Sequence, residues 1–506
     1  MKDTTEYPFV TLLCYRCRIT AVSFALLISG CAVGPDYVRP AHPDVKNYTT
    51  DTLPTRTVSS DSEMGASQQF MSDQNIPADW WKLFSSESLN SLVDESLRRN
   101  PDLEAAQASL HESMENAYAA EGSFFPFVDL NGGPTRQRIS AESFGQRMPP
   151  GSVFTLYNAS VNVSYALDVF GGVRRQVESA QAQADYQRFQ LEGTYLSLTA
   201  NIITATVQEV SLREQIMETQ HLIDIERQQL GVLRDQLKAG VLTQASVLEQ
   251  EATLVQTEAT LPVLRKQMMQ KHDQVTVLTG HFPSEERKTI LALATFHLPE
   301  NLPLSLPSVL VEQRPDIRAA EEQLHEASAN IGVSTAHMLP QITLTGGYGT
   351  SASRFHDMFT FPAEIWNIGA GLTQPVFHGG QLLHEHRASV AAYDRAAAQY
   401  RSTVLLAFEN VSDALHAVQF DAAALQEQVK AAQVAAKSMD VIKQQLQVGS
   451  ITYLALLDAE KTYLQARLNL VQARANRLAD TVALFQALGG GWWNRPPLPE
   501  RATSGT

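Results

Sequence analysis

The stretch PDLEAAQASLH at Pro101–His111 occurs a second time in this chain, as PDIRAAEEQLH at Pro315–His325. The offset between the two copies persists beyond them, since Pro126 of FFPFVDLNGG stands as far from Pro340 of HMLPQITLTGG. Self-similarity at a fixed spacing is the sequence signature of a duplicated structural unit. The chain is therefore predicted to be a tandem duplication of one set of helices and strands.

The similarity extends to the end of each half, and this sets the predicted segments. Leu237–Thr243 (LKAGVLT) recurs as Leu446–Thr452 (LQVGSIT), and LTG at Leu278–Gly280 recurs as ALG at Ala487–Gly489. Each half is predicted to run helix, strand, strand, long helix, turn, helix. The segments are residues 1–30 as a signal peptide, 31–79 as an N-terminal arm, 80–280 as the first repeat, 281–308 as a proline-rich connector at the surface, 309–489 as the second repeat and 490–506 as a C-terminal tail.

Composition narrows the class of protein. The formal net charge is −15, whereas nucleic-acid binding requires a basic surface, so no nucleic-acid partner is expected. The chain has no stretch that approaches the ~20 consecutive apolar residues of a membrane helix. Any crossing of a membrane would therefore be made by β-strands.

The N-terminus has the pattern of a bacterial lipoprotein signal. Arg16 and Arg18 precede the apolar run Ile19–Ile28, and small residues lead to Cys31. Cys31 is the predicted lipid-attachment site, and Ala32 after it favours sorting to the outer membrane. A cytosolic leader with a chance cysteine is the alternative interpretation.

No disulfide or other cysteine site is expected besides Cys31. Cys14 and Cys17 would leave with the signal peptide, so the mature chain would hold one cysteine and no disulfide. Residues 32–79 contain five prolines and no helical periodicity. They are predicted to form an extended arm on the surface of the body.

A strict alternation of apolar and polar residues marks Val153–Val169 as a long strand. Its polar face is small and uncharged as far as Asp168, which favours a membrane barrel with a watery lumen. A soluble two-layer sheet gives the same alternation and is the alternative. A strand around Trp366–Thr373 alternates in the same way. The residues predicted to face lipid are Tyr157, Val161, Val163, Tyr165, Ile368 and Leu372.

Each of these strands has a predicted partner. Pro126–Gly133 precedes the first long strand, with Pro134–Gly151 as an exposed loop between them, and Gln341–Tyr348 is the equivalent in the second repeat. Four strands cannot close a barrel, because the smallest membrane barrels have about eight. The chain is therefore predicted to oligomerise.

After the second strand of each repeat comes a helix of unusual length. Val173–Ala239 and Gln381–Val448 contain no proline, and the first keeps a 3–4 apolar spacing that Glu209, Thr219 and Glu226 interrupt. At 1.5 Å per residue each would span roughly 100 Å. Glycine supplies the left-handed cap of each rod at Gly240 and Gly449, and Thr243 and Thr452 are placed to cap the returning helices.

Several longer motifs together resemble the outer-membrane efflux protein family, in its NodT-type lipoprotein branch, with TolC as a distant relative. They are CAVGPDYVRP at Cys31–Pro40, LPSVLVEQRPDIRAAE at Leu306–Glu321, VFHGG at Val376–Gly380, VGSIT at Val448–Thr452, LLDAE at Leu456–Glu460 and ALGGGWW at Ala487–Trp493. The resemblance implies an α+β membrane protein: a homotrimer whose 12-stranded transmembrane β-barrel, four strands per chain, continues into a periplasmic α-helical coiled-coil tunnel.

The resemblance also implies passive export of small molecules such as drugs and toxic compounds across the outer membrane. An inner-membrane pump, often of the resistance-nodulation-division type, and a periplasmic adaptor protein would deliver the solutes. By position, Gly240, Thr243, Gly449 and Thr452 fall on the tunnel tips that meet the adaptor, and Asp458 falls on a periplasmic gate position. The second gate position is Ala455, which departs from a two-ring gate.

No enzyme chemistry is expected. The sequence has no Gly-x-Ser-x-Gly, no phosphate-binding loop and no HExxH, and no cofactor is predicted besides the covalent lipid on Cys31. His378, His384 and His386 cluster after the last strand and are interpreted as hydrogen-bonding residues rather than metal ligands. Two alternative functions stay open: a structural periplasmic coiled-coil lipoprotein without a pore, and a protein-secretion duct of the same fold.

Overall fold

The computed structural model describes residues 32–51, 53–72, 74–138, 153–285 and 291–495. The chain divides into two compact units, and each takes segments from both repeats. The sheet unit comprises Met1–Arg39, His111–Tyr186 and Glu321–Gln399, and the helical unit comprises Pro40–Leu110, Gln187–Ala320 and Tyr400–Thr506. Cys31 and the predicted signal peptide lie outside the described residues.

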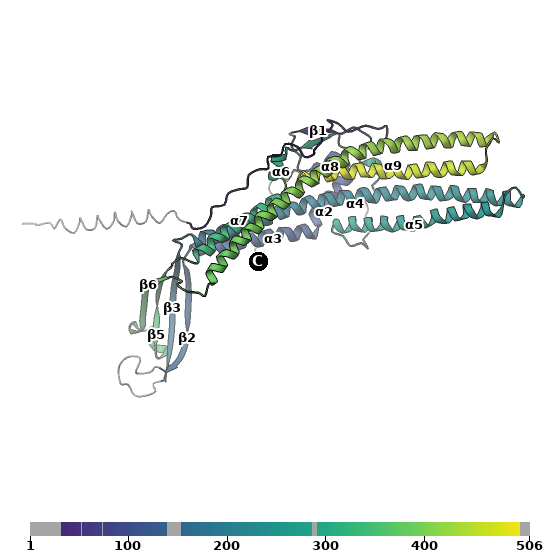
Figure 1. Cartoon of the computed structure of the whole chain (residues 1–506). Helices are drawn as coiled ribbons and strands as arrows, with labels where there is room; N and C mark the ends of the chain where they lie inside the picture. The colour runs from purple at the N-terminus through teal and green to yellow at the C-terminus, as the bar shows by residue number, and fades with distance from the viewer. Residues whose placement is uncertain (1–31, 52, 73, 139–152, 286–290, 496–506) are drawn as a thin grey trace, which may run out of the picture. The chain divides into compact units, whose positions relative to one another are not determined.

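The helices follow one order twice, as the repeated sequence predicts (Figure 1). The first repeat supplies α2 (Glu87–Arg99), α3 (Pro101–Glu121), α4 (Gly172–Lys238) and α5 (Gln244–Leu278), and the second supplies α6 (Pro307–Gln313), α7 (Pro315–Ala336), α8 (Gln381–Gln447) and α9 (Tyr453–Ala487). The rods α4 and α8 have 67 residues each. In the helical unit α5 returns beside α4, and α9 returns beside α8.

The sheet unit contains one antiparallel sheet of four strands in the order β2-β3-β5-β6. The strands are β2 (Phe127–Arg138), β3 (Val153–Leu167), β5 (Gln341–Ala352) and β6 (Glu364–Thr373). β2 is longer than predicted, because residues 134–138 pair with 153–157 of β3 instead of beginning a loop at Pro134. Pro134 pairs with Tyr157 of β3, and β2 is an edge strand of this four-stranded sheet, the position where proline is found in sheets.

The later part of the N-terminal arm and part of the connector reach the core of the helical unit, whereas the sequence predicts both segments at the surface. β1 (Gln69–Ser72) of the arm pairs in parallel with β4 (Asn301–Leu304) of the connector. Around this pair, Ile76 of the arm and Phe296 and Leu302 of the connector are fully buried. Four-residue strands paired across more than two hundred residues leave no periodic trace in the sequence, so composition alone made both segments look like loops.

The core of the helical unit fills the space between the helices and these short strands. Trp80, Phe84 and Phe485 pack against one another, with Trp80 and Phe485 ring centroids 5.3 Å apart. Burying one large apolar side chain contributes ~1.5–3 kcal/mol, so this aromatic cluster fixes the start of the first repeat against the end of α9. Among the described residues, no helix has both the length and the apolar character needed to cross a bilayer.

Candidate functional site

The sheet has one continuous apolar face. Residues directly opposite in antiparallel strands share a face, and the register places Leu130, Val161, Tyr348 and Trp366 in one row and Val128, Val163, Gly346 and Ile368 in the next. Ile368 is 84% exposed and Trp366 is 71% exposed. All six residues predicted to face lipid, namely Tyr157, Val161, Val163, Tyr165, Ile368 and Leu372, lie on this face.

The opposite face is polar and carries few charges. Asp129, Asn162, Gly347 and Asn367 form one row across the four strands. A Cβ on Gly347 would lie 2.3 Å from Asn367 Oδ1 and 2.9 Å from Asn162 Oδ1, so both amides extend into the space beside this glycine. Asn162 Nδ2 donates to Ser160 Oγ at 3.1 Å. The sheet therefore presents a hydrogen-bonding surface on one side and a mainly apolar surface on the other, where Arg136, Arg138 and Glu364 lie toward one end.

Both rods end in the left-handed glycine turn that the sequence predicts. Gly240 has φ +75° and Gly449 has φ +72°. The N–H of each glycine and of the residue after it donate to carbonyls of the last helical turn, as in a Schellman motif. Thr243 and Thr452 occupy the N-cap positions of α5 and α9, but neither side chain accepts a capping hydrogen bond. That part of the prediction is wrong.

Asp458 is exposed and lines a groove of about 660 Å³ between the α4–α5 hairpin and the α8–α9 hairpin. Thr452 and Lys461 of α9 and Glu226 of α4 line the same groove. Glu226 is only 2% exposed, Thr257 Oγ1 donates to its Oε1 at 3.2 Å, and burial raises the pKa of its carboxyl. The sequence marked Glu226 only as an interruption of the helical seam, because the facing helices that enclose it come from distant parts of the chain.

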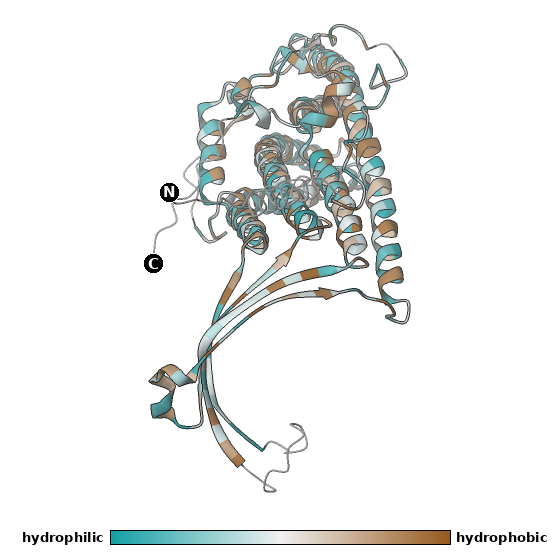
Figure 2. Ribbon diagram, turned by 90° about the vertical axis from the view of Figure 1, so that its left-hand side faces the viewer, coloured by the Kyte–Doolittle hydropathy of each residue, from teal (hydrophilic) through white to brown (hydrophobic). Residues whose placement is uncertain are grey.

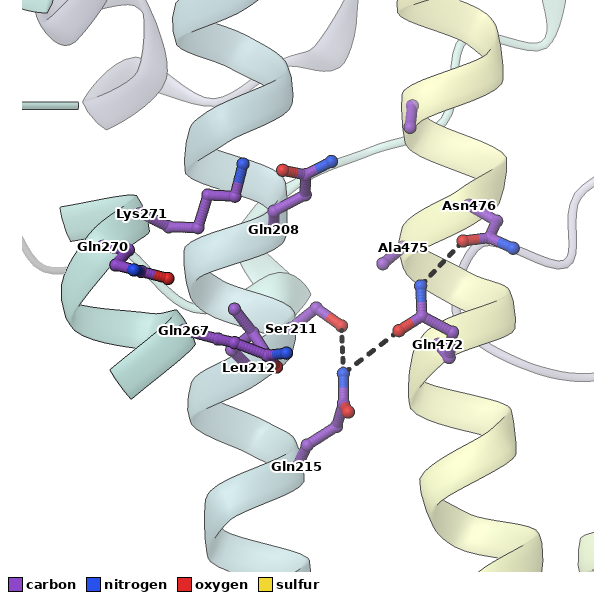
Figure 3. A pocket seen from close by; sticks show the side chains of 11 residues that line it. Gln208, Ser211, Leu212, Gln215, Gln267, Gln270, Lys271, Gln472, Ala475 and Asn476 are labelled. Atoms are coloured by element: carbon purple, nitrogen blue, oxygen red, sulfur yellow. Dashed lines mark hydrogen bonds between the residues drawn. The ribbon is translucent and has the colours of Figure 1, made fainter. Parts of the chain in front are cut away.

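A second groove of about 320 Å³ lies among α4, α5 and α9 and is lined mainly by amides (Figure 3). Gln215 Nε2 donates to Ser211 Oγ at 3.1 Å and to Gln472 Oε1 at 3.2 Å, and Gln472 Nε2 donates to Asn476 Oδ1 at 2.8 Å. Lys271 is the charged side chain in the lining. Amides donate and accept equally, so this wall can hydrogen-bond to water and to polar solutes without selecting a charge.

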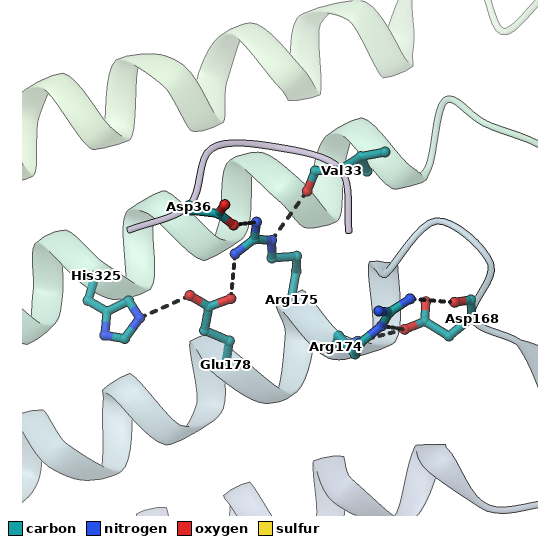
Figure 4. Close-up of polar contacts among 7 residues, drawn as sticks. All are labelled: Val33, Asp36, Asp168, Arg174, Arg175, Glu178 and His325. Atoms are coloured by element: carbon teal, nitrogen blue, oxygen red, sulfur yellow. Dashed lines mark hydrogen bonds and ion pairs between the residues drawn. The ribbon is translucent and has the colours of Figure 1, made fainter. Parts of the chain in front are cut away.

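The residues that follow Cys31 are held against the junction of β3 and α4 (Figure 4). Val33 N–H donates to Phe170 O at 2.9 Å, and Arg175 Nε donates to Val33 O at 3.2 Å. The Arg175 side chain, 5% exposed, also pairs with Asp36 at 2.6 Å and with Glu178 at 2.7 Å. This arginine therefore ties the arm to the first turn of α4.

α7 holds the same stretch of arm from the other side. The Tyr37 ring stacks on His325 with centroids 4.2 Å apart, and His325 Nε2 lies 3.0 Å from Glu178 Oε1. Hydrogen bonds to Glu322 and Glu178 raise the pKa of His325. The residues that come first after the predicted lipid site are thus fixed by aromatic stacking and ionic contacts together.

Two further polar clusters lie away from these surfaces. His386 Nδ1 lies 3.4 Å from Ser334 Oγ and from Thr335 Oγ1, and no group of three or more metal-ligating side chains occurs within the part of the chain that the structure describes. In the helical unit Arg477 is 1% exposed and donates from Nη1 to Val418 O at 2.8 Å. Burial and the neighbouring Asp421 raise the pKa of Asp480 to about 7.

Comparison with known proteins agrees with this geometry. The model of the family described as outer membrane efflux protein matches residues 92–281 and 306–490. The pyoverdine export outer membrane protein OpmQ of Pseudomonas putida is 28% identical, over 88% of this chain and 94% of that protein. The probable outer membrane lipoprotein SilC of Salmonella typhimurium is 23% identical, over 94% of this chain and 99% of that protein.

A solved structure has the same fold. The outer-membrane channel OprN superposes with a TM-score of 0.80 at 26% identity, over 91% of this chain and 100% of that one. On the family match, which spans most of both repeats, this chain belongs to the outer membrane efflux protein family.

Proposed function

We propose that three copies of this chain form the outer-membrane duct of a tripartite efflux system. The observation that carries the proposal is the two-faced sheet of four strands, which exposes hydrocarbon on one side and amides on the other. Four strands cannot close on themselves, and three sheets supply twelve, which is within the range of membrane barrels. The apolar face would then contact lipid and the polar face would line the lumen.

The helical tips are the part that would meet the rest of the system. The turns at Gly240 and Gly449, with Thr243 and Thr452, are exposed at the ends of the two hairpins. A periplasmic adaptor would dock there and pass on solutes from an inner-membrane pump of the resistance-nodulation-division type. The duct itself performs no catalytic step, because its work is to offer a polar path through the membrane.

The anchor and the cargo complete the proposal. A lipid on Cys31 would hold the arm at the membrane, which the contacts of Val33, Asp36 and Tyr37 with the β3–α4 junction and α7 support. Small solutes are the proposed cargo, since OpmQ is described as exporting pyoverdine. The uncharged amide wall of the second groove suits solutes of mixed charge.

The test is conductance of the purified protein in planar lipid bilayers. A duct predicts stepwise currents, and a structural lipoprotein without a pore predicts none. Asp458 would form one ring of carboxylates in the threefold assembly, where like charges held close attract cations. Asp458→Ala should weaken cation selectivity and block by divalent cations, whereas Asp440→Ala, an exposed residue of α8, should leave both unchanged.

A duct with the same currents but unchanged selectivity in Asp458→Ala would remove the gate assignment and leave the channel in place. Absence of current from the parent protein, at concentrations where the trimer inserts, would contradict the proposal that it is a channel.

A further inference from the structure

The connection between β5 and β6 folds back over the apolar face of the sheet. It contains two short 3₁₀ helices, Phe355–Phe359 and Phe361–Ala363. Met358 and Ala363 are buried with Ala352 in a small cluster against Tyr157 and Ala159 of β3. Tyr157 pairs with Ala352 and lies on the apolar face. Figure 2 shows the short helices on the convex side of the bent strands, so the connection leaves the polar side open.

Three of the side chains that this connection exposes are phenylalanines, beside the polar Arg354 and His356. Phe355, Phe359 and Phe361 are 62%, 79% and 87% exposed. The Phe355 ring meets Tyr157 edge-on at 5.8 Å and Phe359 edge-on at 5.7 Å, so the position of the connection is set by packing. Loops that project into water carry small or polar residues at their tips, whereas a patch of large exposed apolar side chains marks a site of contact with a membrane or a protein.

The exposed phenylalanines of the connection continue directly into the apolar face of the sheet. Trp366 and Tyr348 form the first exposed aromatic pair of the sheet below the connection, and Ile368 follows on the same face. Tyr157 and Tyr165 are eight residues apart on β3, roughly 27 Å along the strand. After a barrel tilt of ~35–45° this separation covers about 19–22 Å of depth, most of the ~25 Å apolar band of membrane barrels, whose borders carry aromatic girdles.

The connection lies at the end of the sheet opposite to the end where the strands join the helices. β5 begins at Gln341 after α7, and β6 ends at Thr373 before α8, so Ser353–Ala363 joins the opposite ends of these strands. If the helices are periplasmic, that end reaches the outer leaflet. Aromatic side chains are favoured at the boundary between headgroups and acyl chains.

We propose that the β5–β6 connection is a membrane-contacting element, with Phe359 and Phe361 inserted among the acyl chains of the outer leaflet close to the headgroups. This rests on the proposed function, in which the apolar face of the sheet contacts lipid. The element would set the depth of each protomer in the bilayer, and it leaves the polar face of the sheet uncovered at the mouth. It takes lipid as its partner, rather than a second protein or the aqueous exterior.

Nitroxide labels at single introduced cysteines test this in proteoliposomes of phosphatidylcholine and phosphatidylglycerol. The labelled sites are Phe359→Cys and Phe361→Cys in the connection, Ile368→Cys on the apolar face and Asn367→Cys on the polar face; the parent chain gives the background. All four residues are exposed, so the fold tolerates the change. The rate at which each label collides with oxygen, which concentrates in lipid, reports its exposure to lipid. The rate of collision with a water-soluble nickel chelate reports its exposure to water.

The expected result is an oxygen-to-nickel collision ratio several-fold higher at residues 359, 361 and 368 than at 367, with 359 and 361 shallower than 368. Ratios at 359 and 361 equal to that at 367 would place the connection in water and overturn the proposal. Low collision with both reagents would place it under protein and overturn it as well. In either case a high ratio at 368 would keep the proposed function, whereas a low ratio at 368 would contradict both.

Discussion

At the scale of single residues, the two repeats make equivalent contacts where the returning helix, α5 or α9, ends against the junction of the two shorter helices. Gly280 after α5 has φ +77°, and a Cβ there would lie 2.5 Å from Arg99 O. Gly489 after α9 has φ +91°, and a Cβ there would lie 2.6 Å from Gln313 O. Asn100 Nδ2 donates to Leu278 O at 3.1 Å at the first junction, and at the second Arg314 Nη1 donates to Ala487 O at 2.9 Å.

The second of these glycines gives a direct prediction. Gly489→Ala should destabilise the protein by at least ~1–2 kcal/mol, because a left-handed backbone strains an L-residue and the new methyl group meets a carbonyl. Gly231→Ala is the matched control, since it lies inside α4 with nothing within 4 Å of its Cβ. Alanine there should stabilise by ~0.5–1 kcal/mol. Loss of helical circular dichroism on heating measures both, and equal melting temperatures would contradict this explanation of the junction.

Asp480 predicts how stability depends on pH. Its folded pKa of about 7 is above the ordinary 3.8, so the folded chain binds more protons than the unfolded chain between these values. Stability then falls as pH rises from about 4 to about 7 and is level above. Asp480→Asn removes the titrating group and keeps a donor for Asp421, so it should flatten this slope and raise the melting temperature at pH 8.

The control for Asp480 is Asp235→Asn, an exposed partner of Lys238. Exposed ion pairs contribute little to the free energy of unfolding, so the melting temperature of this variant should depend on pH as that of the parent chain does. A slope that persists in Asp480→Asn would assign the titration to other groups.

At the scale of elements, the sequence predicts what is periodic and what is local. Alternation gives β3 and its two faces, the absence of proline gives both rods, and Gly240 and Gly449 give the turns with positive φ. The end of β2 was missed because pairing with β3, rather than the residues themselves, carries the strand through Pro134. The β1–β4 pair and the groove around Glu226 depend on contacts between distant segments, which one sequence does not encode in any periodicity.

The two faces of β3 predict opposite effects of one substitution at neighbouring positions. Val163→Arg should lower the amount of assembled protein in the outer membrane, because arginine on the lipid face costs up to ~2–4 kcal/mol, depending on its depth in the bilayer. Asn162→Arg points to the polar face and should be tolerated. Immunoblots of outer-membrane fractions compare the two. Equal effects, or a stronger effect of Asn162→Arg, would contradict the assignment of the faces.

Arg175 makes two of the contacts that attach the arm. Arg175→Met should free residues 33–39, because it removes the contacts to Val33 O and Asp36. Amide hydrogen exchange of this segment should become faster by at least an order of magnitude, the equivalent of ~1.4 kcal/mol. Arg174→Met is the control, since Arg174 pairs with Asp168 rather than with the arm. Protection of the arm that survives Arg175→Met would show that its other contacts, the Tyr37–His325 stack and the Arg39–Glu321 ion pair, suffice to hold it.

At the scale of the whole molecule, the chain is incomplete by itself. A sheet with a hydrocarbon face and a hydrogen-bonding face has two edge strands, β2 and β6, whose outer backbone groups need partners inside a membrane. In the proposed assembly, further copies of the sheet supply those partners. The same assembly would bring the rods together into one tunnel and the three Asp458 side chains around one axis.

The most direct test is therefore the mass of the purified, detergent-solubilised protein, measured by native mass spectrometry. Three chains per particle are predicted, each lighter than the 55.7 kDa full chain by its signal peptide and heavier by its acyl groups. A particle that stays a single chain under conditions where its sheet is folded would contradict the assembly, and with it the channel.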